Sequence, residues 1–438
     1  MSSELVTVIM FGGLALSLLL GIPLAWSLGA IPLVIILLLW GSKGFFMVIA
    51  NTFGCIWYIE LVAIPLFISM GIMLERAGIA EALFESMHRW AGRLRGGLAL
   101  GVVVVCVFFA AMTGVTATAT LTMGLIAIPA MLKRGYDRNI AIGTVAGAGT
   151  LGILIPPSII SILLALIGNI SVGKVFMAGV VPGIIIALFY MIYIVVRAWL
   201  NPRLCPSHPE TFTLKQKIIS SKAVILPSLI ILSVLGSIFF GIATPTEASA
   251  LGVVGVVISV LIHRRFSWKL VVDTTVETFR ITGLTMWIFF GAMLFSAVYA
   301  RAGGAAFLTT LITGFGKNPW AVLIIIMLIA FVLGMFLDPF AIIFILGPVS
   351  FSLMKELGFD LTWFSILFVI NMQIGYMSPP FGYQLFYLKS VAPEGVTTAD
   401  IYRAVLVPIA IMIFSMVLFM IFPKLVLWLP ELMMKMRQ

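Results

Sequence analysis

Long apolar segments separated by short polar ones make up almost the whole chain. A helix needs about 20 apolar residues to cross the hydrocarbon core of a bilayer. The alternating ten-residue segments of a membrane β-barrel are absent. The apolar segments predict helices, with ends uncertain by a few residues, over Leu5–Trp26, Pro32–Trp40, Trp57–Met73, Leu98–Ala111, Ala119–Leu132, Ile140–Ile167, Val175–Leu200, Ala223–Phe240, Ala248–His263, Thr285–Ala300, Trp320–Phe336, Pro339–Met354, Thr362–Leu388 and Ala404–Leu429.

Basic residues are grouped between these segments, and the positive-inside rule assigns such groups to the cytoplasm. The four groups are Arg76, Arg89, Arg93 and Arg95; Lys133, Arg134 and Arg138; Arg197, Arg203, Lys215, Lys217 and Lys222; and Arg264, Arg265 and Lys269. If all four are cytoplasmic, the segment Leu98–Leu132 must enter and leave on one side. Glycine and β-branched threonine in its middle are poor helix formers. We therefore expect a re-entrant hairpin with its tip near Gly114–Thr116.

A second hairpin is expected from Trp320 to Met354, with a break at Gly334–Pro339. The charges beyond its end nearly cancel, so that side is not marked as cytoplasmic. Counting crossings then places this hairpin on the outer side and both termini outside, with about nine full crossings in addition to the hairpins.

An internal repeat links the two hairpin regions. Gly135-Tyr136-Asp137 recurs as Gly358-Phe359-Asp360, and Gly152-x-x-x-Pro156-Pro157 recurs as Gly375-x-x-x-Pro379-Pro380, all at an offset of 223 residues. The two copies start on opposite sides by the charge argument. Such inverted repeats are typical of secondary transporters. The alternative is two proline-kinked helices without a common origin.

Each Pro-Pro pair lies within a long apolar segment, where proline removes a backbone donor and breaks the helix. The freed carbonyls, with nearby hydroxyls, suit a small hard cation such as sodium. We expect one sodium site to join the first hairpin tip to the first break and a second to join the second tip to the second break. The first site comprises Gly114, Thr116, Gly149, Gly152 and Pro156, and the second comprises Gly334, Asp338, Gly375, Ser378 and Pro379.

The candidate substrate ligands are three hydroxyls and one carboxylate: Thr116, Thr118, Ser158 and Asp338. A carboxylate at membrane depth is costly and therefore indicates function. The alternatives are an Asp338 exposed to outside water and hydroxyls bonded only to their own helices. Thr244 and Glu247 instead match a capping box at a helix start. The mixed segments Ala80–Arg95 and Phe266–Ile281 are expected to be amphipathic surface helices.

The composition of the chain excludes further classes of protein. Hydrophobic residues make up 62 % of the 438 residues and charged residues 10 %, which excludes a soluble globular enzyme. The net charge of +10 comes from the basic groups between apolar segments and does not indicate a nucleic-acid partner. Three scattered cysteines offer neither a disulfide framework nor zinc-ligand spacing. No Walker A motif is present, so the chain is not expected to hydrolyse ATP by that route. We expect no cofactor, and sodium is the only metal expected.

Four motifs resemble one known family in their order along the chain. They are Thr144–Ser158, Ala127–Pro129 followed by Lys133–Asp137, Gly241–Ala248 and Ser378–Gly382. The sequence is similar to the large membrane (permease) subunit of tripartite ATP-independent periplasmic (TRAP) transporters over nearly its whole length. Where many members have Gly-Ser-Ser at the first tip, this chain has Gly114-Val115-Thr116, with one hydroxyl fewer.

The resemblance implies an all-α polytopic membrane protein, an inverted-repeat elevator-type transporter with two re-entrant hairpins and two broken helices. It implies scaffold helices and an arm in residues 1–95, and further scaffold helices, an arm and a connecting helix in 175–319. The two halves of the transport domain, each a hairpin and a broken helix, would be 96–174 and 320–400, and a C-terminal helix would follow in 401–438. The implied partners are a small four-helix membrane subunit and a periplasmic solute-binding protein in the bacterial inner membrane.

The expected function is uptake of an organic acid, a carboxylate, coupled to a sodium gradient. Two alternatives remain for the transport mode: proton coupling, with Asp338 as the titrating group, and an ion channel, since re-entrant hairpins also build pores. An intramembrane enzyme is disfavoured, because the predicted spans hold no cluster of acid, base and metal ligands.

Overall fold

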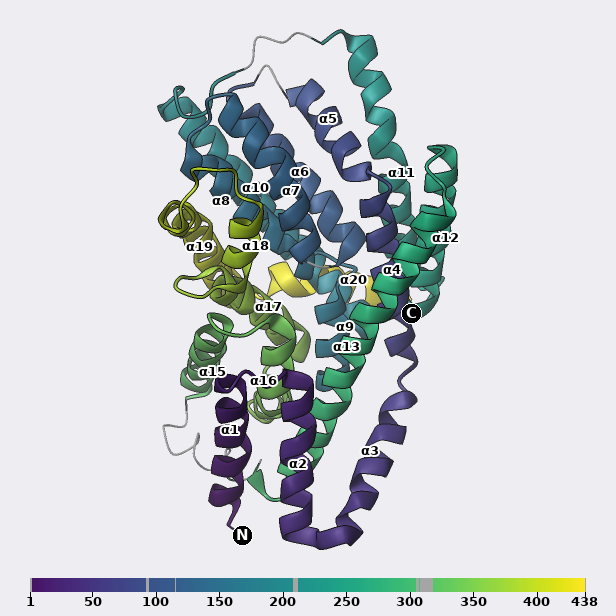
Figure 1. The fold of residues 1–438 in the computed structure, drawn as a ribbon, viewed down its shortest axis with the longest axis vertical. Helices are drawn as coiled ribbons and strands as arrows, with labels where there is room; N and C mark the ends of the chain where they lie inside the picture. The colour runs from purple at the N-terminus through teal and green to yellow at the C-terminus, as the bar shows by residue number, and fades with distance from the viewer. Residues whose placement is uncertain are drawn as a thin grey trace.

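The computed structural model describes residues 2–91, 94–114, 116–207, 212–304, 307 and 318–437, and helices run through nearly all of them (Figure 1). The α-helices are α1 Ser3–Leu19, α2 Leu24–Trp40, α3 Phe45–Ile56, α4 Ala63–Arg76, α5 Ile79–Ala91, α6 Gly97–Thr113, α7 Thr116–Lys133, α8 Arg138–Thr150, α9 Ile159–Gly168, α10 Val172–Leu200, α11 Leu214–Phe239, α12 Pro245–Ile262, α13 Trp268–Arg301, α15 Pro319–Gly334, α16 Pro339–Glu356, α17 Leu361–Met377, α18 Tyr383–Val391, α19 Thr398–Ile421 and α20 Lys424–Met436. Three short 3-10 helices, η1 Gly41–Gly44, η2 Ile59–Val62 and η3 Leu151–Ile153, complete the set within the described residues.

Within the described part of the chain, eight helical segments are long and apolar enough to cross a bilayer. A ninth is added if the pair Ile59–Arg76 and Ile79–Ala91, bent by 61°, counts as one span. These spans include α7 and α16, which the sequence assigns to hairpins. The expected all-α, multi-pass fold is therefore confirmed.

The first hairpin is formed by α6 and α7. Gly114 ends α6 in the left-handed region at φ 62°, and α7 begins at Thr116. The hydroxyl of Tyr136, just beyond α7, accepts a hydrogen bond from the backbone N–H of Leu98 at 3.3 Å, at the start of α6. The backbone N–H of Gly96 also reaches the carbonyl of Cys205 at 3.2 Å. Both ends of the segment thus lie together, as the charge argument predicts.

The second hairpin repeats this arrangement with aromatic side chains. Trp320, at the start of α15, packs edge-on against Phe359, which follows α16, with ring centroids 5.5 Å apart. The turn between the two helices ends at Asp338, whose carboxylate caps α16 by accepting a hydrogen bond from the Ala341 N–H at 2.7 Å. The segment from Trp320 to Met354 therefore also enters and leaves at one end of the helices.

The four basic groups meet at one end of the molecule. Arg134 lies 3.2 Å from the His88 ring, which is next to Arg89 in the first group. Lys217 of the third group lies 5.6 Å from the centre of the Trp90 ring. Arg265 of the fourth group donates a hydrogen bond to the carbonyl of Ala77. These contacts bring described members of the four groups, or residues next to them, close together, as a shared side of the membrane requires.

Equivalent positions of the repeat have equivalent structures. Gly135 and Gly358 both have φ 79°. Asp137 caps α8 and Asp360 caps α17, each with its carboxylate on backbone N–H groups. The expected breaks follow: α8 passes through η3 into a non-helical segment before α9, and α17 ends before α18. Both Pro-Pro peptide bonds are cis.

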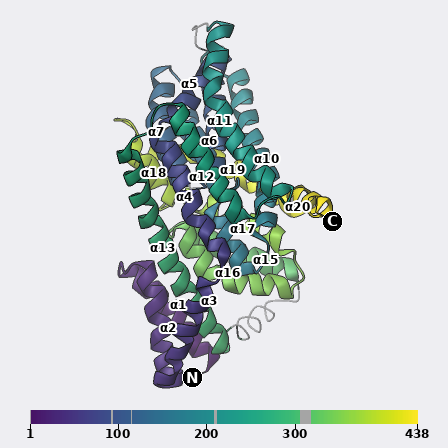
Figure 2. The same ribbon diagram turned by 90° about the vertical axis from the view of Figure 1, so that its right-hand side faces the viewer.

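Three predicted helices are wrong in their extent. Leu5–Trp26 is not one helix, because Gly21, at φ 78°, and Pro23 separate α1 from α2. Phe266–Ile281 is not a separate surface helix, since Trp268–Arg301 is one continuous helix. Ala404–Leu429 is interrupted at Phe422–Pro423, because a proline lacks the N–H that would continue the helix. The resulting α20 projects sideways from the bundle, crosswise to the long helices (Figure 2).

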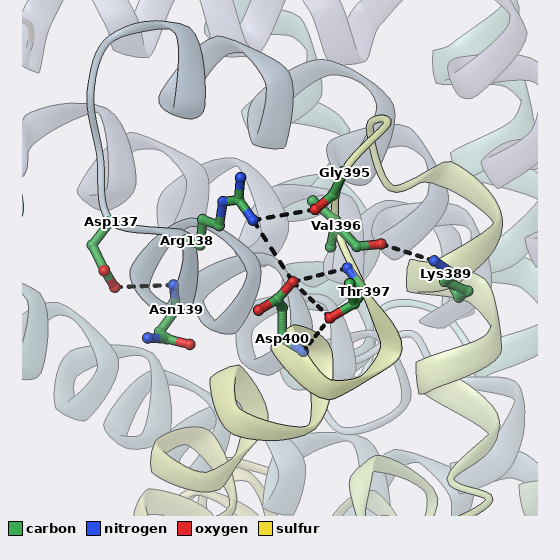
Figure 3. A network of polar contacts seen from close by, with 8 residues as sticks. All are labelled: Asp137, Arg138, Asn139, Lys389, Gly395, Val396, Thr397 and Asp400. Atoms are coloured by element: carbon green, nitrogen blue, oxygen red, sulfur yellow. Dashed lines mark hydrogen bonds and ion pairs between the residues drawn. The ribbon is translucent and has the colours of Figure 1, made fainter.

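A polar network ties the first repeat to the end of the second (Figure 3). Arg138, at the start of α8, donates to the Gly395 carbonyl at 3.1 Å and lies 3.8 Å from the Asp400 carboxylate. Asp400 forms a capping box with Thr397 at the start of α19. Lys389, on α18, donates to the Val396 carbonyl at 2.8 Å. The start of α8 and the connection from α18 to α19 are thereby joined.

Candidate functional site

The two hairpin tips contact the two helix breaks. A Cβ added to Gly334, at the end of α15, would lie 3.0 Å from the Cα of Gly375 in α17. A Cβ added to Gly114 would lie 2.5 Å from the carbonyl oxygen of Pro157. Both approaches therefore require glycine. The pairing of each tip with its own break is the arrangement that the sequence predicts.

A cavity of about 170 Å³ lies between both tips and the middle of α13. Its lining comes from the first tip, the segment around η3 and α9, α13, the second tip, and the break between α17 and α18. The lining residues are Gly114, Thr116, Ala117, Ile153, Ile160, Ile281, Leu284, Thr285, Ile288, Asp338, Pro339, Phe340, Tyr376, Tyr383, Gln384 and Tyr387. Four residues of α13, at positions i, i+3, i+4 and i+7, form one wall, as expected for one face of a helix.

Polar contacts join the two repeats beside this cavity. The hydroxyl oxygens of Thr116 and Tyr376 are 3.4 Å apart. The Tyr376 hydroxyl also donates to the Thr150 carbonyl at 3.4 Å, and Gln373 Nε2 donates to the same oxygen at 2.8 Å. Gln384 Nε2 donates to the Thr120 hydroxyl. The carbonyl that ends α8 thus accepts hydrogen bonds from two side chains of α17.

Of the predicted substrate ligands, Thr116 and Asp338 line the cavity, whereas Thr118 and Ser158 are not among its lining residues. The Ser158 hydroxyl donates to the Ile153 carbonyl at 2.7 Å, and its oxygen caps α9. Thr118 is half-buried on α7. Two of the four predicted ligands therefore line the cavity and two do not.

The remaining predicted sodium-site residues lie along the breaks. Gly149, in the last turn of α8, faces Thr120 and Gln384, and Gly152 is buried in η3. Pro156 lies in the non-helical segment after η3, and Pro379 lies in the break before α18. The Ser378 hydroxyl bonds to the Ile374 carbonyl of its own helix at 2.7 Å. A cation at either break would rest chiefly on backbone carbonyls, because the described residues hold no cluster of three His, Cys, Asp or Glu side chains.

Several cavity residues are not among the predicted ligands. Tyr383 and Tyr387 pack edge-on with ring centroids 4.9 Å apart, and Gln384 between them is fully buried. The sequence contains one signal for them: two tyrosines at i and i+4 share a helix face directly after the second break. The Thr244–Glu247 capping box, in contrast, forms as predicted, with the Thr244 N–H donating to Glu247 at 2.8 Å.

Comparison with known proteins decides the family. The family described as "Tripartite ATP-independent periplasmic transporter, DctM component" matches residues 11–425. The chain belongs to this family. Its resemblance to TRAP large permease subunits, stated from four motifs, is therefore confirmed, and the protein is a transporter permease subunit rather than an enzyme.

Individual relatives agree with this assignment. The C4-dicarboxylate TRAP transporter large permease protein DctM of Pseudomonas aeruginosa is 34 % identical over 374 residues, covering 85 % of this chain and 86 % of that protein. The isethionate TRAP transporter permease protein DctMQ of Oleidesulfovibrio alaskensis is 31 % identical, covering 88 % of this chain and 60 % of the relative. Among solved structures, the YdaH transporter of Alcanivorax borkumensis superposes with a TM-score of 0.62 at 14 % identity, over 88 % of this chain and 90 % of that one. That likeness supports the fold alone.

Proposed function

We propose that this permease subunit takes up an organic acid across the bacterial inner membrane and that a sodium gradient drives the uptake. The observation that supports this best is the cavity between the two hairpin tips and α13. Carriers built from inverted repeats bind solutes at the interface of the repeats, near the membrane midplane. The cavity has this position relative to the two copies, since Gly114 and Asp338 from the two tips both line it.

Sodium would act at the contacts between tips and breaks. An ion at Gly114, Thr116, Gly149, Gly152 and Pro156 would hold the first tip in place, and an ion at Gly334, Asp338, Gly375, Ser378 and Pro379 would do so for the second. Both tips also border the solute. Sodium would therefore favour the solute-bound state, and such differential binding is what couples one ligand to another.

We further propose an elevator movement, in which the hairpins and broken helices slide as one body along a scaffold that includes α13. The network around Arg138 and Asp400 supports one moving body, because it connects the start of α8 to the end of α18. Sliding would carry the cavity from one membrane face to the other while the contacts between tips and breaks stay intact.

The proposed partners are a periplasmic solute-binding protein and a small membrane subunit. The word "tripartite" in the family description supports two further components, and the name DctMQ of the isethionate permease supports a subunit that can be joined to the large one. The named solutes of relatives, a C4-dicarboxylate and isethionate, support an organic anion as the class carried.

The test is uptake by proteoliposomes that contain the full chain and both partners. With a panel of organic acids, we expect accumulation under an inward sodium gradient and none under an equal potassium gradient. Equal uptake with and without the sodium gradient would refute sodium coupling. A proton gradient applied alone tests the proton-coupled alternative, and an Asp338→Asn protein that keeps full proton-driven uptake would exclude Asp338 as its titrating group. Single-channel currents would favour a channel instead.

A further inference from the structure

A groove of about 540 Å³ runs between α5 and α11, which lie side by side (Figures 1 and 2). It is separate from the cavity between the hairpin tips, because the two share no lining residue. Met87 and Trp90 of α5 form one side of the groove. The other side belongs to α11, and its lining residues are Ser221, Val224, Ile225, Ser228 and Leu229.

The α11 side of the groove is an apolar stripe that follows a lysine. Its lining residues are three or four positions apart, so they lie on one face of the helix, and Lys217 lies one turn before Ser221 on that face. The Ser228 hydroxyl donates to the Val224 carbonyl of its own helix at 2.7 Å, which leaves the stripe without a free donor. From Lys217 to Leu229 the helix rises about 18 Å, close to the roughly 15 Å of half the hydrocarbon core. The stripe is therefore about as long as one leaflet of a bilayer.

Polar contacts join α5 to α11 at the lysine end of the groove. Trp90 Nε1 donates to the Ser221 hydroxyl at 2.8 Å, and that hydroxyl donates to the Lys217 carbonyl at 2.9 Å. The Lys217 ammonium group lies 5.6 Å from the centre of the Trp90 ring. A tryptophan with a bonded N–H and a partly exposed ring is typical of the boundary between hydrocarbon and water. This end of the groove thus has the character of a headgroup region.

The lysine end carries positive charge that the described residues do not neutralise. Lys215 and Lys217 lie among the first four residues of α11, where the helix dipole disfavours cations and favours anions. Glu85, on α5, is paired with Arg89 at 2.9 Å, and within the described part of the chain neither lysine forms an ion pair. The positive-inside rule assigns this basic group to the cytoplasmic side, where the bilayer surface is negative. An anion here would be stabilised by both lysines.

We propose that the groove binds one anionic phospholipid of the cytoplasmic leaflet, with its phosphate at Lys217 and an acyl chain between α5 and α11. Basic pockets between membrane helices on this side bind such headgroups. The phosphate supplies the counter-charge that the lysines lack, and an apolar helix of another subunit would not supply it. The net positive charge favours an anionic lipid over a zwitterionic one. The inference does not depend on the proposed transport activity.

The test measures lipid binding to the purified full chain by native mass spectrometry. The chain is stripped of lipid in detergent and titrated with phosphatidylglycerol or phosphatidylcholine that carry the same acyl chains. We expect one phosphatidylglycerol to bind with an apparent Kd about tenfold lower than that of phosphatidylcholine, because two lysines act on the anionic headgroup. Glycerol phosphate, which has no acyl chain, should not compete with it.

Two kinds of variant separate the headgroup contact from the acyl-chain contact. Lys217→Gln should raise the apparent Kd for phosphatidylglycerol about fivefold, and Lys217→Arg should leave it nearly unchanged. Ser228→Phe fills the groove without altering the charge and should abolish tight binding. Lys269→Gln is the matched control, since Lys269 also lies at the start of a helix within a basic group, but on α13, which contributes no residue to the groove. Size-exclusion chromatography shows whether each variant is folded.

Equal affinity for the two lipids, an unchanged Kd in Lys217→Gln, the same loss in Lys269→Gln, or tight binding that survives Ser228→Phe would overturn the proposal. Co-expression with the proposed small membrane subunit tests the other occupant of the groove. A purified complex that retains one phosphatidylglycerol would support the lipid site. Loss of the lipid from that complex, together with failure of the Ser228→Phe chain to assemble, would assign the groove to the subunit and overturn the proposal.

Discussion

Gln373 donates a hydrogen bond from Nε2 to the backbone carbonyl of Thr150 at 2.8 Å, and the two residues are 223 positions apart. This separation equals the offset of the internal repeat, so the bond joins two equivalent positions of the two copies. A pseudo-two-fold axis relates the two copies of an inverted repeat, and two equivalent residues can contact each other only close to that axis. Each residue lies shortly before the break in its own copy, which places the axis beside both breaks.

The first prediction concerns Gln373, which is fully buried. Replacing it with methionine keeps the volume and removes the bond to Thr150, so the free energy of unfolding should fall by about 1–3 kcal/mol. Uptake should fall further than this loss of stability explains, because the bond connects the two copies. The measurement is sodium-driven uptake per folded protein, with folding followed by size-exclusion chromatography.

Asn371→Leu is the control for this variant. Asn371 Nδ2 donates to the Met327 carbonyl at 2.8 Å, so the bond stays within the second copy. A similar loss of stability with nearly normal uptake is expected. If both variants reduce uptake equally at equal stability, the bond between the copies has no special role.

The second prediction concerns the contact between Gly334 and Gly375. A Cβ on Gly375 would lie 2.9 Å from the Gly334 Cα, which is too close for two carbon atoms. Because the Gly334 Cα belongs to the backbone, the clash can be relieved only if α15 and α17 move apart. Alanine at either position should cost about 1–3 kcal/mol, as overpacking does. Because the tip would move away from the break, the sodium concentration for half-maximal uptake should rise or uptake should be lost.

Gly347→Ala provides the matched substitution in the same hairpin. Its added Cβ would lie 3.5 Å from the Ile167 side chain, an ordinary contact, and alanine favours the helix by roughly 1 kcal/mol over glycine. Unchanged sodium dependence is expected. An altered dependence here, or an unaltered one in Gly334→Ala, would argue against the contact as part of a sodium site.

The hairpins could be predicted from sequence because several independent signals agree on them. The basic groups mark one side, and glycine with β-branched threonine marks the first tip. The ends of α1 and α2 were missed although Gly21 and Pro23 are both visible in the sequence. The length of the surrounding apolar run predicts one crossing, whereas Gly21 and Pro23 divide it into two helices.

The cavity could be predicted only in part, for a physical reason. Thr116 and Asp338 stand out because polar groups are costly in an apolar segment. Ser158 and Ser378 stand out for the same reason, yet the Ser158 hydroxyl donates to the Ile153 carbonyl in η3, and the Ser378 hydroxyl donates to the Ile374 carbonyl of its own helix. Tyr387 and the α13 wall could not be found, because sequence pattern does not say which apolar faces enclose a solute.

The third prediction concerns the native cysteines, all three of which are buried. Cys205 lies between α10 and α11, outside the predicted spans, and burial, with the nearby Asp137 carboxylate, raises its pKa to about 11. Only the thiolate reacts with maleimide. Labelling of the folded chain near neutral pH should therefore be slow and should increase with pH up to about 11.

Mass spectrometry after labelling with and without denaturant checks this result. In denaturant Cys205 should react with the pKa of an ordinary thiol, about 8.5. Fast labelling of Cys205 in the folded chain at neutral pH would show that the contact of its segment with the first hairpin opens readily.

The last prediction tests the sliding of α16 along α13. Because the buried native cysteines are expected to react slowly, a thiol reagent should modify mainly cysteines that are introduced. Ser296 on α13 and Ser352 on α16 line one cavity of about 180 Å³ between the two helices. Cysteines at both positions should be joined by a bifunctional thiol reagent. If α16 belongs to a moving body and α13 to the scaffold, the cross-link should stop uptake, because the two helices can no longer slide past each other. Cleaving a reducible cross-linker should restore uptake, and each single-cysteine variant treated in the same way should keep it. Full uptake by a quantitatively cross-linked protein would mean that α13 and α16 move together, and the scaffold would then have to lie elsewhere.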